Sequence, residues 1–519
     1  MMLREMLKGC DYTQRSSDDG TLMNTEVSGV AYDSRNVEEG FLFVATKGER
    51  YDGHDFIKEA IGKGAVAAVV ERELREIENR CILVKNGKKA LACISNNFCG
   101  RPSENLTLIG ITGTNGKTTV TYMLKSVLES WGKDVGLIGT IRYMIKDEVY
   151  PAAHTTPEAL EFQGLLRMML LSGCTHVVSE VSSHALAQYR VDRAVFHTAV
   201  FTNLTRDHLD FHKTMEDYFR AKERLFQELL DDDGTAVINL DDPYGKRLSS
   251  ELRRSRTNIN ILTYGREYGA DMIASDIEVS SRGLSFTISF EGRGYRISSR
   301  LTGMPNVYNI MSAVGTSISL GVPWQVILDG SKNSADIAGR FEKIDAGQKF
   351  LCVIDYAHTE DALERLIYTA RGIISSPTPA VAKKRNKGEG DFPFAGGPAP
   401  RIITVFGCGG DRDRGKRPKM GEVATKLSDH VIVTSDNPRS EGPSDIIKDI
   451  LGGVTVNNYL VEPDRRKAIG IAVEMAEDGD IVLIAGKGHE DYQEIKGVRY
   501  PFSDRQVAEE AIKNRMRIS

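Results

Sequence analysis

A glycine-rich run that also holds a lysine and three threonines has the residue types that bind a nucleoside triphosphate. Gly113-Thr-Asn-Gly-Lys-Thr-Thr119 follows the apolar, β-branched run Leu106–Ile111 and precedes a helical pattern, Thr118–Trp131. Glycines let the backbone approach an anion, amide groups at a helix start face it, and Lys117 adds positive charge. Mg²⁺ prefers oxygen ligands such as the Thr118 hydroxyl. We predict that ATP and Mg²⁺ bind at Gly113, Thr114, Asn115, Gly116, Lys117, Thr118 and Thr119.

The match to the common phosphate-loop motif is incomplete. The first glycine of G-x-x-x-x-G-K-[ST] would fall at Ile111. The alternative is an ordinary glycine-rich turn between a strand and a helix. The lysine followed by two threonines favours phosphate binding, but the loop alone predicts a nucleotide and no particular reaction.

Two further polar clusters follow apolar runs. Glu180 ends the run His176–Val181, and His208 lies in Thr202–His212, directly after the apolar stretch Ala199–Asn203. A carboxylate and a histidine at neighbouring strand ends suit a divalent ion beside the nucleotide. Zinc is the competing metal, but no cysteine lies nearby and the phosphate loop favours magnesium. Taken singly, each cluster also fits a capped strand–helix junction.

These residues must be positioned by buried strands that alternate with helices, which is the pattern of parallel α/β sheets. In open α/β sheets, ligands bind outside the carboxyl ends of the strands, so the polar clusters should share clefts. Helices are predicted at Thr118–Trp131, Asp361–Ile374 and Pro418–Leu427. Strands are predicted at Leu106–Ile111, Asp134–Ile138, His176–Val181, Ala199–Asn203, Ala236–Leu240, Phe350–Asp355, Arg401–Phe406, His430–Thr434 and Asp480–Ala485.

The chain length predicts about three domains. We place them at residues 1–103, 104–339 and 340–519. Alternation in residues 265–300 indicates an antiparallel excursion within the middle domain. Residues 375–400 are rich in Pro, Gly, Ser and Lys, which predicts a surface loop.

Composition narrows the class of protein. Of 519 residues, 41% are hydrophobic and 27% charged, and the net charge of −5 indicates neither a general nucleic-acid binder nor a membrane-surface binder. The seven cysteines form no C-x-x-C pair, which argues against a disulfide framework and for a reducing compartment. No signal peptide or run of about 18 apolar residues is found, so we expect a cytoplasmic protein without a membrane span.

Taken together, ordered motifs over nearly the whole chain resemble the Mur ligase family. N-terminal and C-terminal motifs narrow the resemblance to the subclass that adds the third amino acid of the peptidoglycan stem peptide. The general motifs are Gly113–Thr118, Glu180–His184, Asn203–Asp210, Ala338–Glu342 and Asp355–His358. The narrowing motifs are Tyr32–Arg35, Gly40–Val44, Gly53–His54, Phe406–Asp413, Gly415–Pro418, Asp436–Arg439 and Gly486–Glu490.

The resemblance implies three domains: a small N-terminal α/β domain for a uridine nucleotide, a central ATPase with a mostly parallel sheet, and a C-terminal Rossmann-like domain. It implies that ATP phosphorylates the D-Glu side-chain carboxylate of UDP-MurNAc-L-Ala-D-Glu. The amine of an incoming amino acid then attacks the acyl phosphate and forms an amide. We expect a monomer that binds neither nucleic acid nor membrane.

The resemblance also implies residue roles. Lys117, Glu180, His208 and Lys222 would be catalytic, with Lys222 carbamylated so that a cation becomes an anion able to bind magnesium. Spacing alone would instead put Lys222 on a solvated helix face. By resemblance, Thr118, Glu180, His208 and Lys222 hold metal, Asn309, Arg340 and Asp355 contact nucleotide, and Ser34, Thr155, Thr156, Ser182, Gln188 and Arg190 contact the UDP-muramyl peptide.

The tetrapeptide Asp436-Asn-Pro-Arg439 bears on which amino acid is added. An arginine binds a carboxylate bidentately, which suits meso-2,6-diaminopimelate and repels the terminal ammonium of lysine. Taken without context, the motif is an Asn-Pro turn with a solvated arginine, and some use of lysine stays open. By resemblance, the pocket comprises Arg412, Asp436, Asn437, Arg439, Gly486 and Glu490.

Three other functions are considered. A folylpolyglutamate synthase would share the ATP loop, but would not be expected to carry Tyr32–Arg35 or Asp436–Arg439. A nucleotide-dependent switch or transport protein would hydrolyse ATP without forming an amide. A non-catalytic homologue is disfavoured because Lys117, Glu180, His208 and Lys222 are all present.

Overall fold

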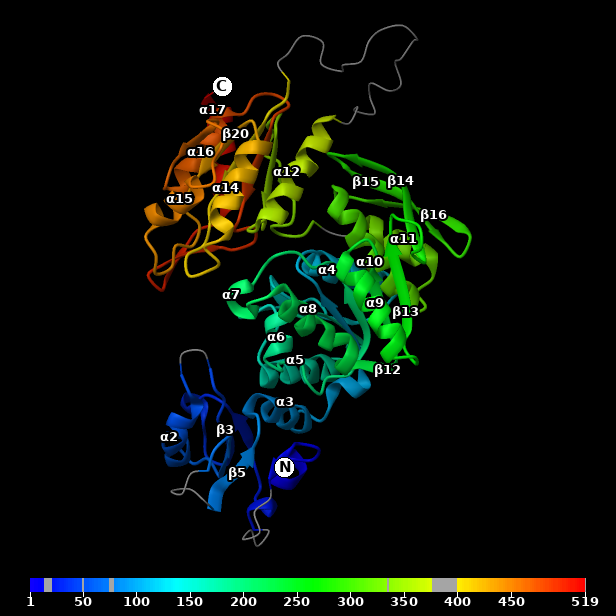
Figure 1. The fold of residues 1–519 in the computed structure, drawn as a ribbon, viewed down its shortest axis with the longest axis vertical. Coiled ribbons are helices and arrows are strands. Elements are labelled where there is room, and N and C mark those ends of the chain that lie inside the picture. The colour runs from blue at the N-terminus through cyan, green and yellow to red at the C-terminus, as the bar shows by residue number, and fades with distance from the viewer. Residues whose placement is uncertain (14–20, 49–50, 74–78, 334–335, 376–398, 519) are drawn as a thin grey trace.

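The computed structural model describes residues 1–13, 21–48, 51–73, 79–333, 336–375 and 399–518. Three α/β bodies follow one another along the long axis, with the N-terminal body (blue) at one end and the C-terminal body (orange to red) at the other (Figure 1). The predicted α/β class is confirmed.

The N-terminal body is a five-stranded sheet in the order β1-β5-β4-β3-β2. Strands β2 to β5 pair in parallel, and β1 is antiparallel to β5. Its strands are β1 (Tyr12–Thr13), β2 (Gly29–Ala31), β3 (Phe41–Val44), β4 (Ala67–Val70) and β5 (Cys81–Val84). Its α-helices are α1 (Leu3–Met6), α2 (Ile57–Gly62) and α3 (Gly87–Phe98).

The central body is an eleven-stranded sheet in the order β16-β15-β14-β13-β12-β11-β6-β10-β7-β8-β9. Pairing is parallel from β14 through β7 and antiparallel at both edges, which confirms the antiparallel excursion predicted in residues 265–300. The strands are β6 (Thr107–Thr112), β7 (Val135–Ile138), β8 (Arg142–Ile145), β9 (Glu148–Pro151), β10 (His176–Glu180), β11 (Phe196–Phe201), β12 (Leu230–Asn239), β13 (Asn260–Gly265), β14 (Met272–Ser280), β15 (Gly283–Phe290) and β16 (Arg293–Ser299).

Two apolar clusters bury the two faces of this sheet. One packs α4 (Lys117–Ser130), α10 (Met304–Ser319) and α11 (Trp324–Asn333) against it. The other packs α5 (Ala159–Leu171), α8 (Met215–Arg224) and α9 (Pro243–Ser255). The short helices α6 (Ser183–Ala187) and α7 (Leu209–His212) follow β10 and β11, so they lie at the strand ends where the polar clusters were predicted.

The C-terminal body is a six-stranded sheet in the order β17-β18-β22-β19-β20-β21, with only β17 antiparallel. Its strands are β17 (Glu342–Ile344), β18 (Leu351–Asp355), β19 (Ile402–Phe406), β20 (His430–Val433), β21 (Tyr459–Val461) and β22 (Ile481–Ala485). Helices α12 (Glu360–Ser375), α14 (Lys416–Leu427) and α15 (Pro443–Leu451) cover one face, and α16 (Arg465–Met475) and α17 (Asp504–Ile518) the other. A separate hairpin joins β23 (Tyr492–Ile495) to β24 (Val498–Pro501).

The predicted strands are all present, although β12 begins at Leu230, six residues before its apolar run. The domain limits at 103/104 and 339/340 stay predictions. Within the described part of the chain, no sheet crosses either of them. Most of the loop predicted at 375–400 lies outside the described residues, which omit 376–398. Among the helices that the structure describes, none is long and apolar enough to cross a membrane.

The cysteine prediction needs a correction, because the structure records one disulfide, Cys10–Cys93. The end of the first helical segment packs on α3, which brings together two sulfurs separated by 83 positions in sequence. Sequence spacing could not show this contact. Cys99, Cys174, Cys352 and Cys408 are free and buried, and Cys81 is buried as well.

Candidate active site

The phosphate loop leaves β6 in a conformation that requires its glycines. Gly113 has φ +148° and Gly116 φ +91°. A Cβ on Gly113 would lie 1.9 Å from the Thr202 hydroxyl oxygen, and one on Gly116 would lie 2.3 Å from Asn309 Oδ1. Lys117 begins α4, and its Nζ donates to the carbonyl oxygens of Gly113 and Thr114, both at 2.9 Å. Burial lowers the pKa of Lys117.

Glu180 lies at the carboxyl end of β10 with no solvent exposure. Its Oε2 accepts from the hydroxyls of Thr118 at 3.1 Å and Thr140 at 2.9 Å, and its Oε1 accepts from the Thr140 amide at 2.9 Å. The structure thus joins Thr118 to Glu180, as two ligands of one ion would require. Thr140 was missed from sequence, and its only signal is its place just after the predicted strand Asp134–Ile138.

His208 lines the same cavity as Thr118 and Glu180. It has φ +54°, and its Nε2 lies 3.3 Å from Asp207 Oδ2. Burial lowers its pKa, which favours the neutral imidazole that binds metal. Within the described residues, no three His, Cys, Asp or Glu side chains form a ready-made metal cluster. The oxygen-rich set of Thr118, Glu180 and Thr140 fits a partly hydrated Mg²⁺ better than Zn²⁺.

Spacing alone suggested that Lys222 lies on a solvated helix face, but the structure buries it. It is 1% exposed on α8, and its Nζ donates to the carbonyl oxygen of Gly113 at 2.9 Å. The Nζ also lies 4.6 Å from the centre of the Tyr218 ring. Burial, with the nearby charge of Lys117, lowers the pKa of Lys222 well below its ordinary value.

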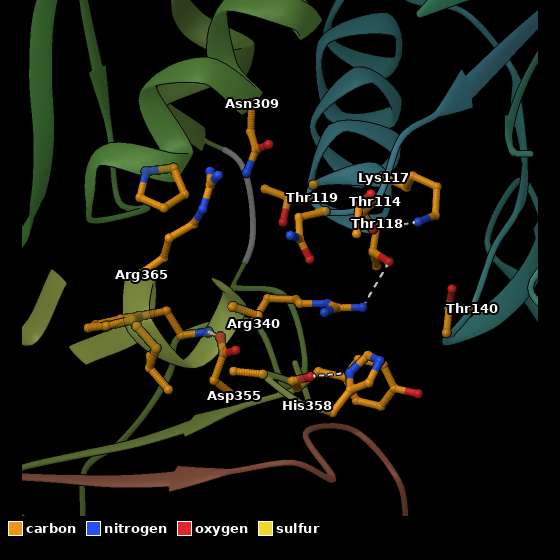
Figure 2. A pocket seen from close by; sticks show the side chains of 18 of the residues that line it. Thr114, Lys117, Thr118, Thr119, Thr140, Asn309, Arg340, Asp355, His358 and Arg365 are labelled. Carbon is orange, nitrogen blue, oxygen red and sulfur yellow. Dashed lines mark hydrogen bonds between the residues drawn. The ribbon is translucent and has the colours of Figure 1, made fainter. Parts of the chain in front are cut away.

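The far wall of the nucleotide cavity comes from the C-terminal body. Figure 2 shows Arg340 reaching across the cavity to Thr118, whose hydroxyl oxygen accepts from its Nη2 at 3.2 Å. The buried Nε of Arg340 has no hydrogen-bond partner among the described residues, so it fits an anion. Asp355 Oδ2 accepts from the Phe341 amide at 2.7 Å and so holds the segment that carries Arg340, while burial raises the pKa of Asp355. Asn309 lines the same cavity.

A second contact across this boundary was missed from sequence. Asp361, in the first turn of α12, accepts at Oδ2 from Asn115 Nδ2 at 3.0 Å and from the Thr205 hydroxyl at 3.2 Å. It therefore ties the C-terminal body to the phosphate loop. Its only sequence signal was its position at the start of a predicted helix.

The residues predicted for the UDP-muramyl peptide lie along a path rather than in one cavity. Ser34, Gln188 and Arg190 line a cavity shared with the N-terminal body, whereas Thr155 and Ser182 line the nucleotide cavity. Thr156 connects the two, because its hydroxyl donates to the Glu180 carbonyl oxygen at 2.8 Å and its own carbonyl oxygen accepts from Arg190 at 3.1 Å. Lys88, Arg35 and Tyr51 also line the N-terminal cavity and were missed.

A third cavity holds all the residues predicted for the incoming amino acid: Arg412, Asp436, Asn437, Arg439, Gly486 and Glu490. Gly486 has φ +119°, and a Cβ there would lie 2.5 Å from Asp436 Oδ2. Asp207 and His208 line this cavity as well as the nucleotide cavity. Tyr356 and His358 also line both cavities, so the amino-acid and nucleotide cavities adjoin at these four residues.

Comparison with known proteins now decides the family. Three family models match: the Mur ligase family catalytic domain over residues 26–99, the Mur ligase middle domain over 111–317, and the Mur ligase glutamate ligase domain over 394–488. A UDP-N-acetylmuramoyl-L-alanyl-D-glutamate–2,6-diaminopimelate ligase of Solibacter usitatus is 46% identical over 95% of this chain and 94% of its own.

The chain belongs to the Mur ligase family. It is an ATP-dependent acid–amino-acid ligase. A relative of the same name from Aquifex aeolicus is 44% identical over 94% of each chain. A solved structure of a ligase with that name superposes with a TM-score of 0.69 at 32% identity and covers 99% of both chains. This Mur ligase thus has the three-domain fold of its family over its whole length.

Proposed function

We propose that this Mur ligase joins meso-2,6-diaminopimelate to UDP-MurNAc-L-Ala-D-Glu, with ATP converted to ADP and phosphate. One observation carries the proposal: the nucleotide cavity shares lining residues with the pocket that holds Arg439, and Thr156 links it to the cavity toward the N-terminal body. This arrangement supports one binding place for each of three substrates, with the reacting groups expected to meet where the nucleotide and amino-acid cavities adjoin. The relatives named above carry the same activity in their names.

The residues suit phosphoryl transfer to a carboxylate. That step brings several negative charges together and needs fixed positive charge and positioning more than covalent chemistry. Lys117 comes from the phosphate loop and Arg340 from the C-terminal body, and both line the nucleotide cavity. Mg²⁺, held by Thr118 and Glu180 with His208, would neutralise charge on the phosphates. The order of events proposed is acyl phosphate formation, attack by the amine, and collapse of the tetrahedral intermediate to the amide.

We also propose that Lys222 is carbamylated. A neutral amine reacts with CO₂, and burial favours the neutral amine of Lys222. The nitrogen lies against the phosphate loop at Gly113, so a carbamate there would place an anion beside the metal ligands. Conversion of a buried cation into a metal-binding anion would also remove its repulsion with Lys117.

Arg439 supports diaminopimelate over lysine as the added amino acid. Its side chain is held by Gly410, whose carbonyl oxygen accepts from Nη1 at 2.7 Å, and by Glu494, 3.5 Å from Nε. A guanidinium fixed in this way binds a carboxylate and repels an ammonium. The runner-up is the same reaction with L-lysine. We expect the monomeric protein to act in the cytoplasm, where its nucleotide substrates are available.

Phosphate release tests the proposal. Purified protein receives ATP, Mg²⁺ and UDP-MurNAc-L-Ala-D-Glu, with meso-diaminopimelate, L-lysine or no amino acid. Release only with diaminopimelate, together with the UDP-muramyl tripeptide in the mass spectrum, is the expected result. Phosphate release with lysine alone would refute the assignment of Arg439 to a diaminopimelate pocket. The proposed ligase activity would still stand. Release with no dependence on an amino acid would point to a nucleotide switch.

A further inference from the structure

A buried lysine that the proposed mechanism does not use lies beneath the amino-acid pocket. Lys487 follows β22 and has no solvent exposure. Its Nζ donates to Asn437 Oδ1 and to Glu490 Oε2, both at 3.0 Å. Asn437 and Glu490 line the pocket, whereas Lys487 does not. The Lys487 ammonium therefore contacts two side chains that line the pocket.

The orientation of Asn437 is set by its partners. Its Oδ1 accepts from Lys487 and also from the Glu494 amide at 2.9 Å, while its Nδ2 donates to Glu490 Oε2 at 2.7 Å. A flipped amide would turn its NH₂ group toward the Lys487 ammonium and its oxygen toward the Glu490 carboxylate. Both contacts would be repulsive, so one orientation is favoured.

These contacts leave one carboxylate oxygen of Glu490 for a ligand. Oε2 accepts two hydrogen bonds, whereas Oε1 accepts none from the described residues. Across the same pocket, the Arg439 Nη1 and Nε are held by Gly410 and Glu494. The pocket thus offers a fixed carboxylate oxygen and a fixed guanidinium, which complement an ammonium and a carboxylate on one carbon.

We propose that Lys487 is a positioning residue that aims Glu490 at the ammonium group on the far end of the incoming amino acid. This inference rests on the proposed function, since diaminopimelate has that ammonium beside its far carboxylate. Removal of Lys487 would leave Asn437 free to flip and Glu490 free to turn, so the site would bind an ammonium less well. A residue that only stabilised the fold would affect every substrate alike.

The experiment compares ligands that differ at that far end. meso-Diaminopimelate has both groups, and 2-aminopimelate keeps the carboxylate but lacks the second ammonium. In Lys487→Met, the KM for meso-diaminopimelate should rise roughly 10- to 100-fold, as for loss of a hydrogen bond to a charged group. The inhibition constant of 2-aminopimelate, measured in competition with diaminopimelate, should change less than about threefold, because it makes no contact with Glu490. The KM values for ATP and the UDP substrate should stay unchanged.

Arg401→Met is the matched control. Arg401 pairs with Asp480 at 2.8 Å just before β19 and β22, at the opposite ends of strands that lead to the pocket. The Arg401→Met substitution removes an ion pair from the same sheet. It should leave the KM values and the inhibition constant of 2-aminopimelate unchanged. Lys487→Gln is the second variant, because its amide still donates to Asn437 but its charge is gone. It should show a smaller form of the same selective change.

Each outcome of this experiment either supports or overturns the positioning role of Lys487. An equal weakening of diaminopimelate and 2-aminopimelate would overturn the inference, as would an unchanged KM in Lys487→Met. If thermal melts show that both lysine variants fail to fold, Lys487 has a role in the stability of the fold. That result would also overturn the inference. With Glu490→Gln added, the two changes should be strongly non-additive; simple additivity would contradict a role through Glu490. If the wild-type protein fails to use diaminopimelate, the proposed function itself fails.

Discussion

Two lysines of this Mur ligase are equally buried but have opposite surroundings. Lys222, under the phosphate loop, meets a backbone carbonyl oxygen and the charge of a second lysine. Lys487, under the amino-acid pocket, meets a carboxylate and an amide oxygen. Burial without a directly paired carboxylate favours the neutral, reactive amine, whereas burial in contact with a carboxylate suits a fixed ion pair. These surroundings support the roles proposed above, reaction for Lys222 and positioning for Lys487.

The largest effect should follow removal of the phosphate-loop charge. Lys117→Met should lower kcat by about 1000-fold, because one fixed charge at a developing anion contributes this much. Amino-acid-dependent phosphate release measures it. Lys246→Met, a surface lysine paired with Glu267, should retain full activity. A loss of less than about tenfold in Lys117→Met would contradict the catalytic role.

The second prediction tests whether Lys222 is carbamylated. Removal of CO₂ from the buffers should lower activity severalfold, and added bicarbonate should restore it, because the carbamate is in equilibrium with the neutral Lys222 amine. Lys222→Met should lose at least about 100-fold in kcat and should not respond to bicarbonate. Wild-type activity that is indifferent to CO₂, with no added CO₂ in the mass of the native protein, would refute carbamylation.

The third prediction moves to the amino-acid pocket. Arg439→Met should raise the KM for meso-diaminopimelate roughly 10- to 100-fold, since a charged hydrogen-bonding partner of the carboxylate is lost. The KM for ATP should be unchanged, as measured by initial rates. Arg414→Met, an exposed arginine paired with Asp449, is the matched control. Similar changes in both variants would show that the Arg439 effect is not specific.

The fourth prediction concerns the Asp361 contact that joins the C-terminal body to the phosphate loop. Asp361→Asn should raise the KM for ATP about 3- to 10-fold, because neutral acceptors replace charged ones for Asn115 and Thr205. The KM for diaminopimelate should change less. Asp329→Asn on α11, which makes the same charged-to-neutral change at a surface contact with Gln325, should behave as wild type. An unchanged KM for ATP in Asp361→Asn would show that the contact does not help hold nucleotide.

The smallest expected effect is a change in the thermal stability of the fold when the ion pair between Arg417 and Glu441 is removed. Arg417 holds the pKa of Glu441 at about 2, below its ordinary 4.5, and Glu441 supports the Asp411 amide near the pocket. A lowered carboxyl pKa stabilises the fold fully above pH 4.5, and this contribution is lost as pH falls toward 2. Glu441→Gln should therefore lower Tm by a few degrees at pH 7, and the difference from wild type should shrink below pH 4.5. A difference that is independent of pH would contradict the charge-based account.

The two sites also differ in how far the sequence predicts them. The phosphate loop is contiguous, and its strand, turn and helix were all visible in the residue pattern. The partners missed from sequence act over distance: Thr140 meets Glu180 across 40 positions, Lys487 meets Asn437 across 50, and Asp361 meets Asn115 across 246. No local pattern encodes these contacts. The Cys10–Cys93 disulfide was missed for the same reason.

The sequence by itself determined the fold class, the family and the residue types available at each site, because hydrophobic periodicity and ordered motifs are local properties of a chain. Together with the family resemblance, the chemistry of an arginine side chain predicted Arg439 as a carboxylate ligand. Only the tertiary structure decided that Lys222 is buried against Gly113 and that Lys487 is buried against Glu490. The reason is physical: the charge state and orientation of a side chain depend on desolvation and on neighbouring charges that folding brings from distant segments.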